Sequence, residues 1–235
     1  MKNFDVIMNS ERDVRFKPTN GSHTKNDGMV TQYNPPDIGT KDTYRMGILA
    51  IPKNASSSIR NMIWITSYNA KQKWSDPAYF INLAKHWENI DDIIVILRNP
   101  YERFMSALNM FLTTRQWEGG IMKCNNDQTE ITLLNEHVYS QSYYLEDVLG
   151  AGADITDKLR YFYMSNTDDV TRDIAKCFPQ LVRHEDSHLN RENKSFPVVT
   201  DVNKEMIRKI YKQDFDLIEN TEFMNSEKIS FNKGE

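Results

Sequence analysis

The chain has 235 residues, of which 39% are hydrophobic and 26% charged, and its formal net charge is −4 at pH 7. This length and composition predict a globular protein with a substantial core, and the acidic balance argues against broad electrostatic binding to nucleic acid. No segment is apolar for long enough to span a bilayer, and the apolar stretch near Met1 is too short for a signal peptide. We therefore expect a cytoplasmic protein with two reduced thiols, Cys124 and Cys177, rather than a disulfide framework.

Residues 1–44 are polar and rich in turn signals such as Asn20-Gly21 and Pro35-Pro36. We expect this segment to form an N-terminal arm that lies over the domain or is partly disordered. From residue 45 onwards, apolar runs and helix-spaced apolar residues predict the secondary structure. Strands are expected at 46–51, near 79–83, at 92–98 and at 159–164. Helices are expected at 57–69, 100–114, 131–137, 140–149, 168–177 and 200–218, and loops at 118–130 and 182–198.

This alternation of strands and helices predicts an α/β fold in one domain, residues 45–235. Its centre is a mostly parallel sheet flanked by helices. Ligands in such folds bind at the carboxyl ends of the parallel strands. Two of the predicted strands end in residues that suit an anion.

The first of these strand ends is a polar loop between the strand at 46–51 and the next helix. The loop holds Lys53, Asn54, Ala55, Ser56, Ser57 and Ser58. Unpaired N–H groups and the positive dipole end of a helix N-terminus bind anions, and the lysine and serines add a cation and donors. An ordinary turn with a serine N-cap is the alternative interpretation.

The second strand end is Arg98, which follows five apolar residues in a row. Such a run predicts a strand that is covered on both faces. Asn99 suits an N-cap, Pro100 the first helical position, and Glu102 a capping box. Arg98 is therefore expected at the carboxyl edge of the sheet, where a guanidinium group can bind phosphate with paired donors.

Together the two segments resemble the paired signatures of sulfotransferases that use 3′-phosphoadenosine-5′-phosphosulfate (PAPS). Residues 51–58, IPKNASSS, are similar to the Pro-Lys loop that binds the 5′-phosphosulfate in that family. Residues 98–106, RNPYERFMS, are similar to the Arg-x-Pro-x-x-Arg-x-x-Ser segment that binds the 3′-phosphate. The match is closer to the carbohydrate sulfotransferases than to the cytosolic phenol and steroid type. Shorter similarities follow at 137–145, 188–190 and 210–215.

The resemblance implies a three-layer, P-loop-like fold and transfer of a sulfuryl group from PAPS to a hydroxyl or amine of an acceptor, a carbohydrate or a small metabolite. The product nucleotide is 3′-phosphoadenosine-5′-phosphate (PAP), and no metal is implied. Lys53 would neutralise the bridging oxygen. Arg103 is either part of the signature's site or an exposed helix arginine. The implied nucleotide ligands are Lys53, Asn54, Ala55, Ser56, Ser57, Ser58, Arg98, Ser106, Arg191 and Lys194.

An acceptor hydroxyl also needs a general base, and a histidine suits this role because its unperturbed pKa lies near neutrality. Several carbohydrate sulfotransferases place a base histidine, and others a glutamate, between the two signatures. His86 is the only histidine there, so the resemblance implies that His86 is the base. Glu88 is the fallback, and His137 lies where the family has an acceptor-side histidine. A solvated loop histidine is the alternative interpretation of His86.

Two other functions stay open. A P-loop nucleotide kinase would carry Gly-x-x-x-x-Gly-Lys-[Ser/Thr], whereas here the lysine precedes the loop and the loop has no glycine. A non-catalytic module of the same fold would bind the nucleotide without turnover. The segments expected to contact the acceptor, 1–44, 70–90 and 115–145, are those least like any known pattern. The acceptor and the oligomeric state therefore stay open, and neither nucleic acid nor a membrane is an expected partner.

Overall fold

The computed structural model describes residues 15–18, 27–33, 44–49, 51–56, 58–59, 62, 79–82, 91–114, 122–124, 130–133, 136–149, 153–179, 181 and 201–225. The chain forms two compact units. The first unit comprises Met1–His23, Asn99–Ser142 and Glu192–Ile218. The second unit comprises Thr24–Arg98, Tyr143–Arg191 and Glu219–Glu235.

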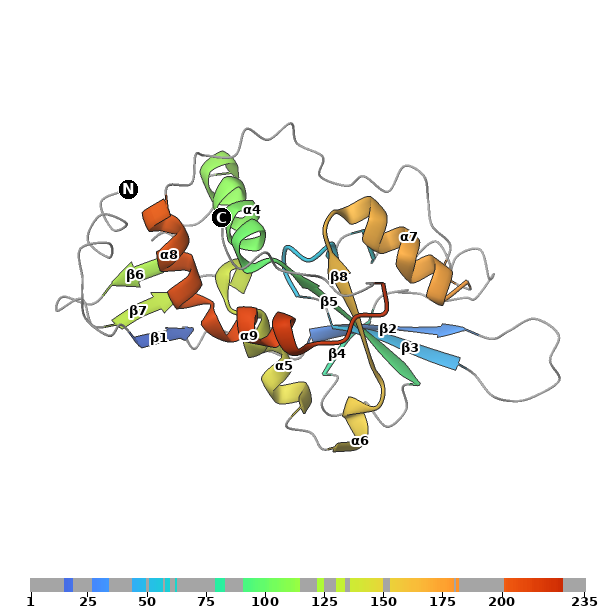
Figure 1. Cartoon of the computed structure of the whole chain (residues 1–235). Helices are drawn as coiled ribbons and strands as arrows, with labels where there is room; N and C mark the ends of the chain where they lie inside the picture. Colours follow the sequence, from blue (N-terminus) through green and yellow to red (C-terminus); the bar gives the residue numbers. More distant parts are fainter. Residues whose placement is uncertain are drawn as a thin grey trace, which may run out of the picture. The chain divides into compact units, whose positions relative to one another are not determined.

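Within the described residues, a five-stranded sheet forms the centre of the second unit (Figure 1). Its strands, in spatial order, are β4 (Tyr79–Asn82), β2 (Asp27–Tyr33), β3 (Tyr44–Leu49), β5 (Asp92–Arg98) and β8 (Leu159–Met164). β3, β5 and β8 run parallel, whereas β2 pairs antiparallel with both β3 and β4. The predicted α/β class is confirmed, and its parallel part consists of β3, β5 and β8.

β5 shows why the parallel strands form. Its five central residues, 93–97, are all buried, as expected for a strand with layers on both faces. The bounds of β5 and β8 are those that the apolar runs predict. β3 ends at Leu49 rather than at the predicted Ile51, because the Ile51 N–H already bonds to the Leu49 carbonyl in the turn that follows.

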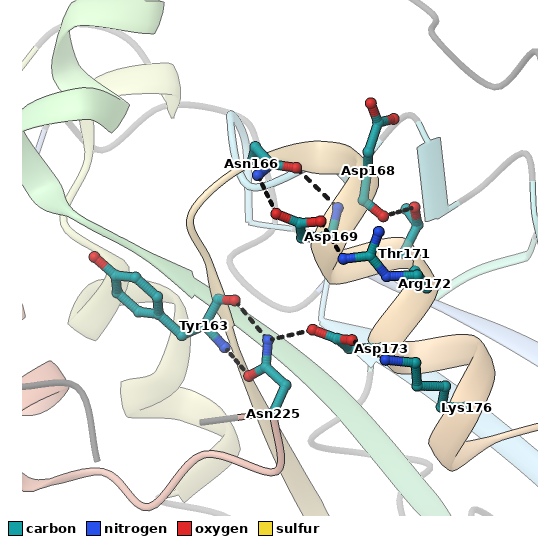
Figure 2. Close-up of polar contacts among 9 residues, drawn as sticks. All are labelled: Tyr163, Asn166, Asp168, Asp169, Thr171, Arg172, Asp173, Lys176 and Asn225. Atoms are coloured by element: carbon teal, nitrogen blue, oxygen red, sulfur yellow. Dashed lines mark hydrogen bonds and ion pairs between the residues drawn. The ribbon is translucent and has the colours of Figure 1, made fainter. Parts of the chain in front are cut away.

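The core of the second unit joins the parallel strands to α7 (Thr167–Cys177), which begins at the N-cap residue Asn166 (Figure 2). Ile94 and Ile96 of β5 belong to it, since alternate side chains of a strand share one face. The predicted helix 168–177 is confirmed and starts one residue earlier. The core residues are Met46, Ile48, Ile59, Met62, Ile94, Ile96, Phe162, Met164, Val170, Ile174, Phe178 and Leu181.

C-terminal residues cover the outer edge of β8, the last strand of the sheet. The Met224 N–H donates to the Tyr161 carbonyl over 2.9 Å. The Asn225 amide binds both main-chain groups of Tyr163: Oδ1 accepts from the N–H and Nδ2 donates to the carbonyl, each over 2.9 Å (Figure 2). The Phe223 ring packs against the Tyr163 ring with centroids 5.5 Å apart. These contacts pair main-chain groups that an end strand otherwise leaves open.

In the part of the first unit that the structure describes, three short strands form a second sheet. They are β1 (Arg15–Pro18), β7 (Glu130–Leu133) and β6 (Met122–Cys124), in that spatial order. β1 pairs parallel with β7, and β6 pairs antiparallel with β7. The predicted loop at 118–130 is therefore wrong where it contains β6, and the predicted helix at 131–137 is wrong where its first residues belong to β7. Ile131 and Thr132 are β-branched, which favours a strand where partners are present on both sides.

Among the described residues, the helices of the first unit are α4 (Pro100–Thr114), the 3₁₀ turn η2 (Glu136–Val138), α8 (Asp201–Ile210) and most of α9 (Lys212–Asn220). α5 (Gln141–Leu149) begins in this unit, and α6 (Ala153–Thr156) lies in the second. α4 is confirmed to the residue and contacts α8.

The predicted helix 200–218 is interrupted at Tyr211, where the Asp214 N–H bonds to the Tyr211 carbonyl in a tighter turn. None of the described helices has both the length and the hydropathy that crossing a membrane requires.

Candidate functional site

The turn after β3 is the first part of the candidate site. The Asn54 N–H bonds to the Ile51 carbonyl over 3.2 Å and closes the turn. Helical residues follow Ala55, whose carbonyl accepts from the Ile59 N–H over 3.0 Å. The predicted order of strand, polar turn and start of a helix is confirmed in the described residues, whereas most of the predicted helix at 57–69 lies outside them.

Lys53 and Ala55 of this turn have left-handed backbones, with φ of 69° and 56°. This conformation costs a residue that carries a Cβ roughly 1–2 kcal/mol. Such strain clusters at ligand-binding and active sites, and turns of this kind direct main-chain N–H groups at anions. The strained backbone thus marks this turn as a candidate site independently of the lysine and serine side chains.

Ala55→Gly should raise the free energy of unfolding by on the order of 1 kcal/mol, because glycine adopts a positive φ without a Cβ clash. Ala175→Gly, inside α7, is the matched control and should lower the free energy of unfolding by about 0.5–1 kcal/mol. Urea unfolding measures both changes. A loss of stability at both positions would show that residue 55 does not hold a left-handed backbone in solution.

Two side-chain contacts tie this turn to β5. Asn54 is 2% exposed, and its Nδ2 donates to the Ile96 carbonyl over 2.6 Å. Nη1 of Arg98 donates to the Lys53 carbonyl over 3.3 Å. Because β3 and β5 are parallel neighbours, Lys53 and Arg98 lie at the same carboxyl edge of the sheet. The structure therefore brings together Lys53 and Arg98, the two basic residues that the sequence predicts at the nucleotide, through the Lys53 main chain.

The other predicted site residues are distributed as follows. Ala55 and Ser56 are partly buried, and Ser58, which is 3% exposed, faces the interior. Ser106 is partly buried in α4 of the first unit, and its role as a phosphate ligand stays a prediction. Four predicted residues lie outside the described residues: Ser57, His86, Arg191 and Lys194.

Arg103 of the second signature is a buried residue of the first unit. Its side chain is 1% exposed and is among the largest that are fully buried. Nη1 of Arg103 donates to the Tyr139 carbonyl over 2.5 Å. The interpretation of Arg103 as an exposed helix arginine is therefore wrong, since the side chain binds the main chain of the segment 138–142.

Tyr211 and Asp214 bind the same segment. The Tyr211 hydroxyl donates to the Val138 carbonyl over 2.5 Å. The Asp214 carboxylate accepts from the Gln141 N–H over 2.8 Å and from the Ser142 N–H over 2.9 Å, and thereby caps α5. Arg103, Tyr211 and Asp214, here called the buried polar cluster, thus hold four main-chain groups between residues 138 and 142.

The electrostatics of the cluster follow from its burial. Burial raises the pKa of the Asp214 carboxyl, and the charge of Arg103 and the two N–H donors oppose that rise. Burial also raises the pKa of the Tyr211 hydroxyl far above its usual range, so the hydroxyl stays protonated and donates. The sequence did not single out either residue as functional. Its one signal was the similarity at 210–215, which contains both.

Among the described residues, no group of three or more His, Cys, Asp and Glu side chains is arranged to hold a metal ion. Comparisons with models of protein families, with curated proteins and with solved structures found no match. The function is therefore inferred from the residues and geometry of the site itself.

Proposed function

We propose that this chain is a sulfotransferase that moves the sulfuryl group of PAPS to a hydroxyl or amine of an acceptor. The observation that carries the proposal is the hydrogen bond from Arg98 to the Lys53 carbonyl. This bond joins the two segments that resemble the family's signatures. It lies at the carboxyl edge of two adjacent parallel strands, the edge at which α/β proteins bind ligands.

The donor set at this edge suits a nucleotide that carries a phosphosulfate and a second phosphate. Lys53 contributes an ammonium group, Ser56 a hydroxyl and Arg98 a guanidinium, and all three bind phosphate oxygens well. The left-handed turn and the helix that follows add main-chain N–H groups. We assign the 5′-phosphosulfate to the turn and the 3′-phosphate to Arg98.

When bound, PAPS supplies a sulfuryl group on a phosphate leaving group. Lys53 neutralises the negative charge that grows on the bridging oxygen, so it contributes more in the transition state than in the ground state. A general base removes the proton of the acceptor hydroxyl. We propose His86 for this role, with Glu88 and His137 as alternatives. The scheme requires no divalent metal.

We further propose that the second unit has the three-layer, P-loop-like fold of these enzymes. Three parallel strands with α7 packed in the same core support this assignment. A carbohydrate or small metabolite as acceptor, and a cytoplasmic location, belong to the same proposal. Both rest on the sequence and its resemblance to the family.

Arg98→Ala should weaken the binding of PAP by roughly 10- to 100-fold, as expected for losing a charge-assisted contact of about 1.5–3 kcal/mol. AMP, which lacks the 3′-phosphate, should bind the wild type and the variant about equally. Isothermal titration calorimetry with both nucleotides measures the two effects.

Arg160→Ala is the matched control. Arg160 forms an ion pair with Asp92, at the opposite end of β5, over 2.6 Å. The loss of the Arg160 side chain should change neither the affinity for PAP nor the affinity for AMP. If Arg98→Ala weakened the binding of AMP as much as the binding of PAP, Arg98 would only support the Lys53 turn and would not bind the 3′-phosphate.

A further inference from the structure

Asn54 was expected to bind the nucleotide, yet its side chain is buried in the second unit. It is 2% exposed, and Nδ2 donates to the Ile96 carbonyl of β5 over 2.6 Å. Its own N–H bonds to the Ile51 carbonyl over 3.2 Å. The residue directly after Lys53 is therefore anchored through both its main chain and its side chain.

These anchors matter because Lys53 has a strained backbone, with φ of 69°. A strained conformation persists only where the surrounding structure holds it. Asn54 holds the C-terminal side of Lys53, and Arg98 holds the Lys53 carbonyl. Without the bond to Ile96, the turn gains the freedom to relax toward negative φ at Lys53, which moves the start of the lysine side chain.

We infer that Asn54 is a positioning residue for Lys53. Its hydrogen bond to the Ile96 carbonyl of β5 fixes the position of the Lys53 ammonium group during sulfuryl transfer. This inference rests on the proposed function. It gives Asn54 a role in the rate of the reaction rather than in nucleotide affinity. Misplacing a catalytic group by about 1 Å costs on the order of 10²-fold in rate.

The test compares Asn54→Ala with Asn225→Ala in the full chain. Asn225 is a matched control because its amide also binds main-chain groups of a strand in the same sheet. Those groups belong to Tyr163 of β8 (Figure 2). β8 is separated from β3 by β5. The measurements are kcat and KM for PAPS with the acceptor that the wild type uses best, the Kd of PAP, and the Tm.

Asn54→Ala should lower kcat by about 100-fold and change the Kd of PAP by less than about 3-fold. Asn225→Ala should lower the Tm and leave kcat within about 2-fold of the wild type. If Asn54→Ala does not fold, Asn54→Ser, which keeps a shorter donor, replaces it with an expected kcat loss of about 10-fold.

The outcomes separate the inference from the proposed function. An Asn54 variant with wild-type kcat overturns the inference and leaves the proposed function in place. Failure of both Asn54 variants to fold also overturns it, because Asn54 then serves stability alone. A wild type that neither binds PAP nor turns over PAPS overturns the proposed function, and the inference with it.

Discussion

Lys53→Ala should lower the kcat of sulfuryl transfer by about 10²–10³-fold, the usual effect of removing a group that stabilises charge in a transition state. The charge of Lys53 acts most strongly when the bridging oxygen becomes negative. The Kd of PAP should therefore rise by much less, about 10-fold at most. Initial rates with saturating PAPS and calorimetric titration with PAP, on the same preparations, separate the two effects.

Lys176→Ala is the control for this loss of a lysine. Lys176 lies in α7 of the same unit, is 67% exposed and pairs with Asp173 over 3.1 Å. Its removal should change neither kcat nor the affinity for PAP. A Lys53→Ala enzyme with wild-type kcat and only a raised KM would show that Lys53 binds the ground state and does not stabilise the transition state.

Asp214→Ala should lower the free energy of unfolding by about 3–5 kcal/mol, the effect of removing one partner from a buried charged network. The substitution leaves the Gln141 and Ser142 N–H groups without their carboxylate acceptor and removes the negative charge that acts on Arg103. This loss is a large fraction of the roughly 5–15 kcal/mol that stabilises a typical domain. Urea-induced unfolding, followed by circular dichroism, measures it.

Asp216→Ala tests whether the burial of Asp214 is the cause of the expected loss of stability. Asp216 lies two residues further along α9, is 56% exposed and contacts Lys212 over 3.7 Å. An exposed pair of this kind contributes at most about 1 kcal/mol, so stability should hardly change. Equal losses at 214 and 216 would contradict the view that the buried polar cluster stabilises the first unit.

The elements predicted most accurately carry their signals locally. β5 and β8 are apolar runs whose burial decides their structure. α4 begins at Pro100 and is preceded by Asn99, whose side chain accepts from the Tyr101 N–H. By contrast, β1, β6 and β7 are short strands, β2 lies in a polar segment rich in turn signals, and the sequence gives no sign of the partners of these four strands. Their formation depends on pairing with other segments, some of them distant in the chain, as for β1 with β7 and β2 with β4. Periodicity within one segment cannot indicate such pairing.

The residues of the candidate site also fall into those that the sequence predicts and those that it does not. The positions of Lys53 and Arg98 were predictable because Lys53 follows one apolar strand and Arg98 ends another, and parallel strands end at a common edge. Three other features of the two units could not be predicted: the inward direction of Asn54, the burial of Arg103 and the cap that Asp214 provides. A polar residue has the same appearance in a sequence whether it faces solvent or a buried main-chain group, so only the structure distinguishes the two.

The most direct test of the proposed function is the transfer of a labelled sulfuryl group from PAPS to a panel of hydroxyl and amine acceptors, in the presence of EDTA. We predict that labelled product and PAP appear together without a divalent metal, and that Lys53→Ala abolishes most of the signal. An absence of PAP release with every acceptor, or a strict requirement for Mg²⁺, would contradict the assignment of this chain as a PAPS-dependent sulfotransferase.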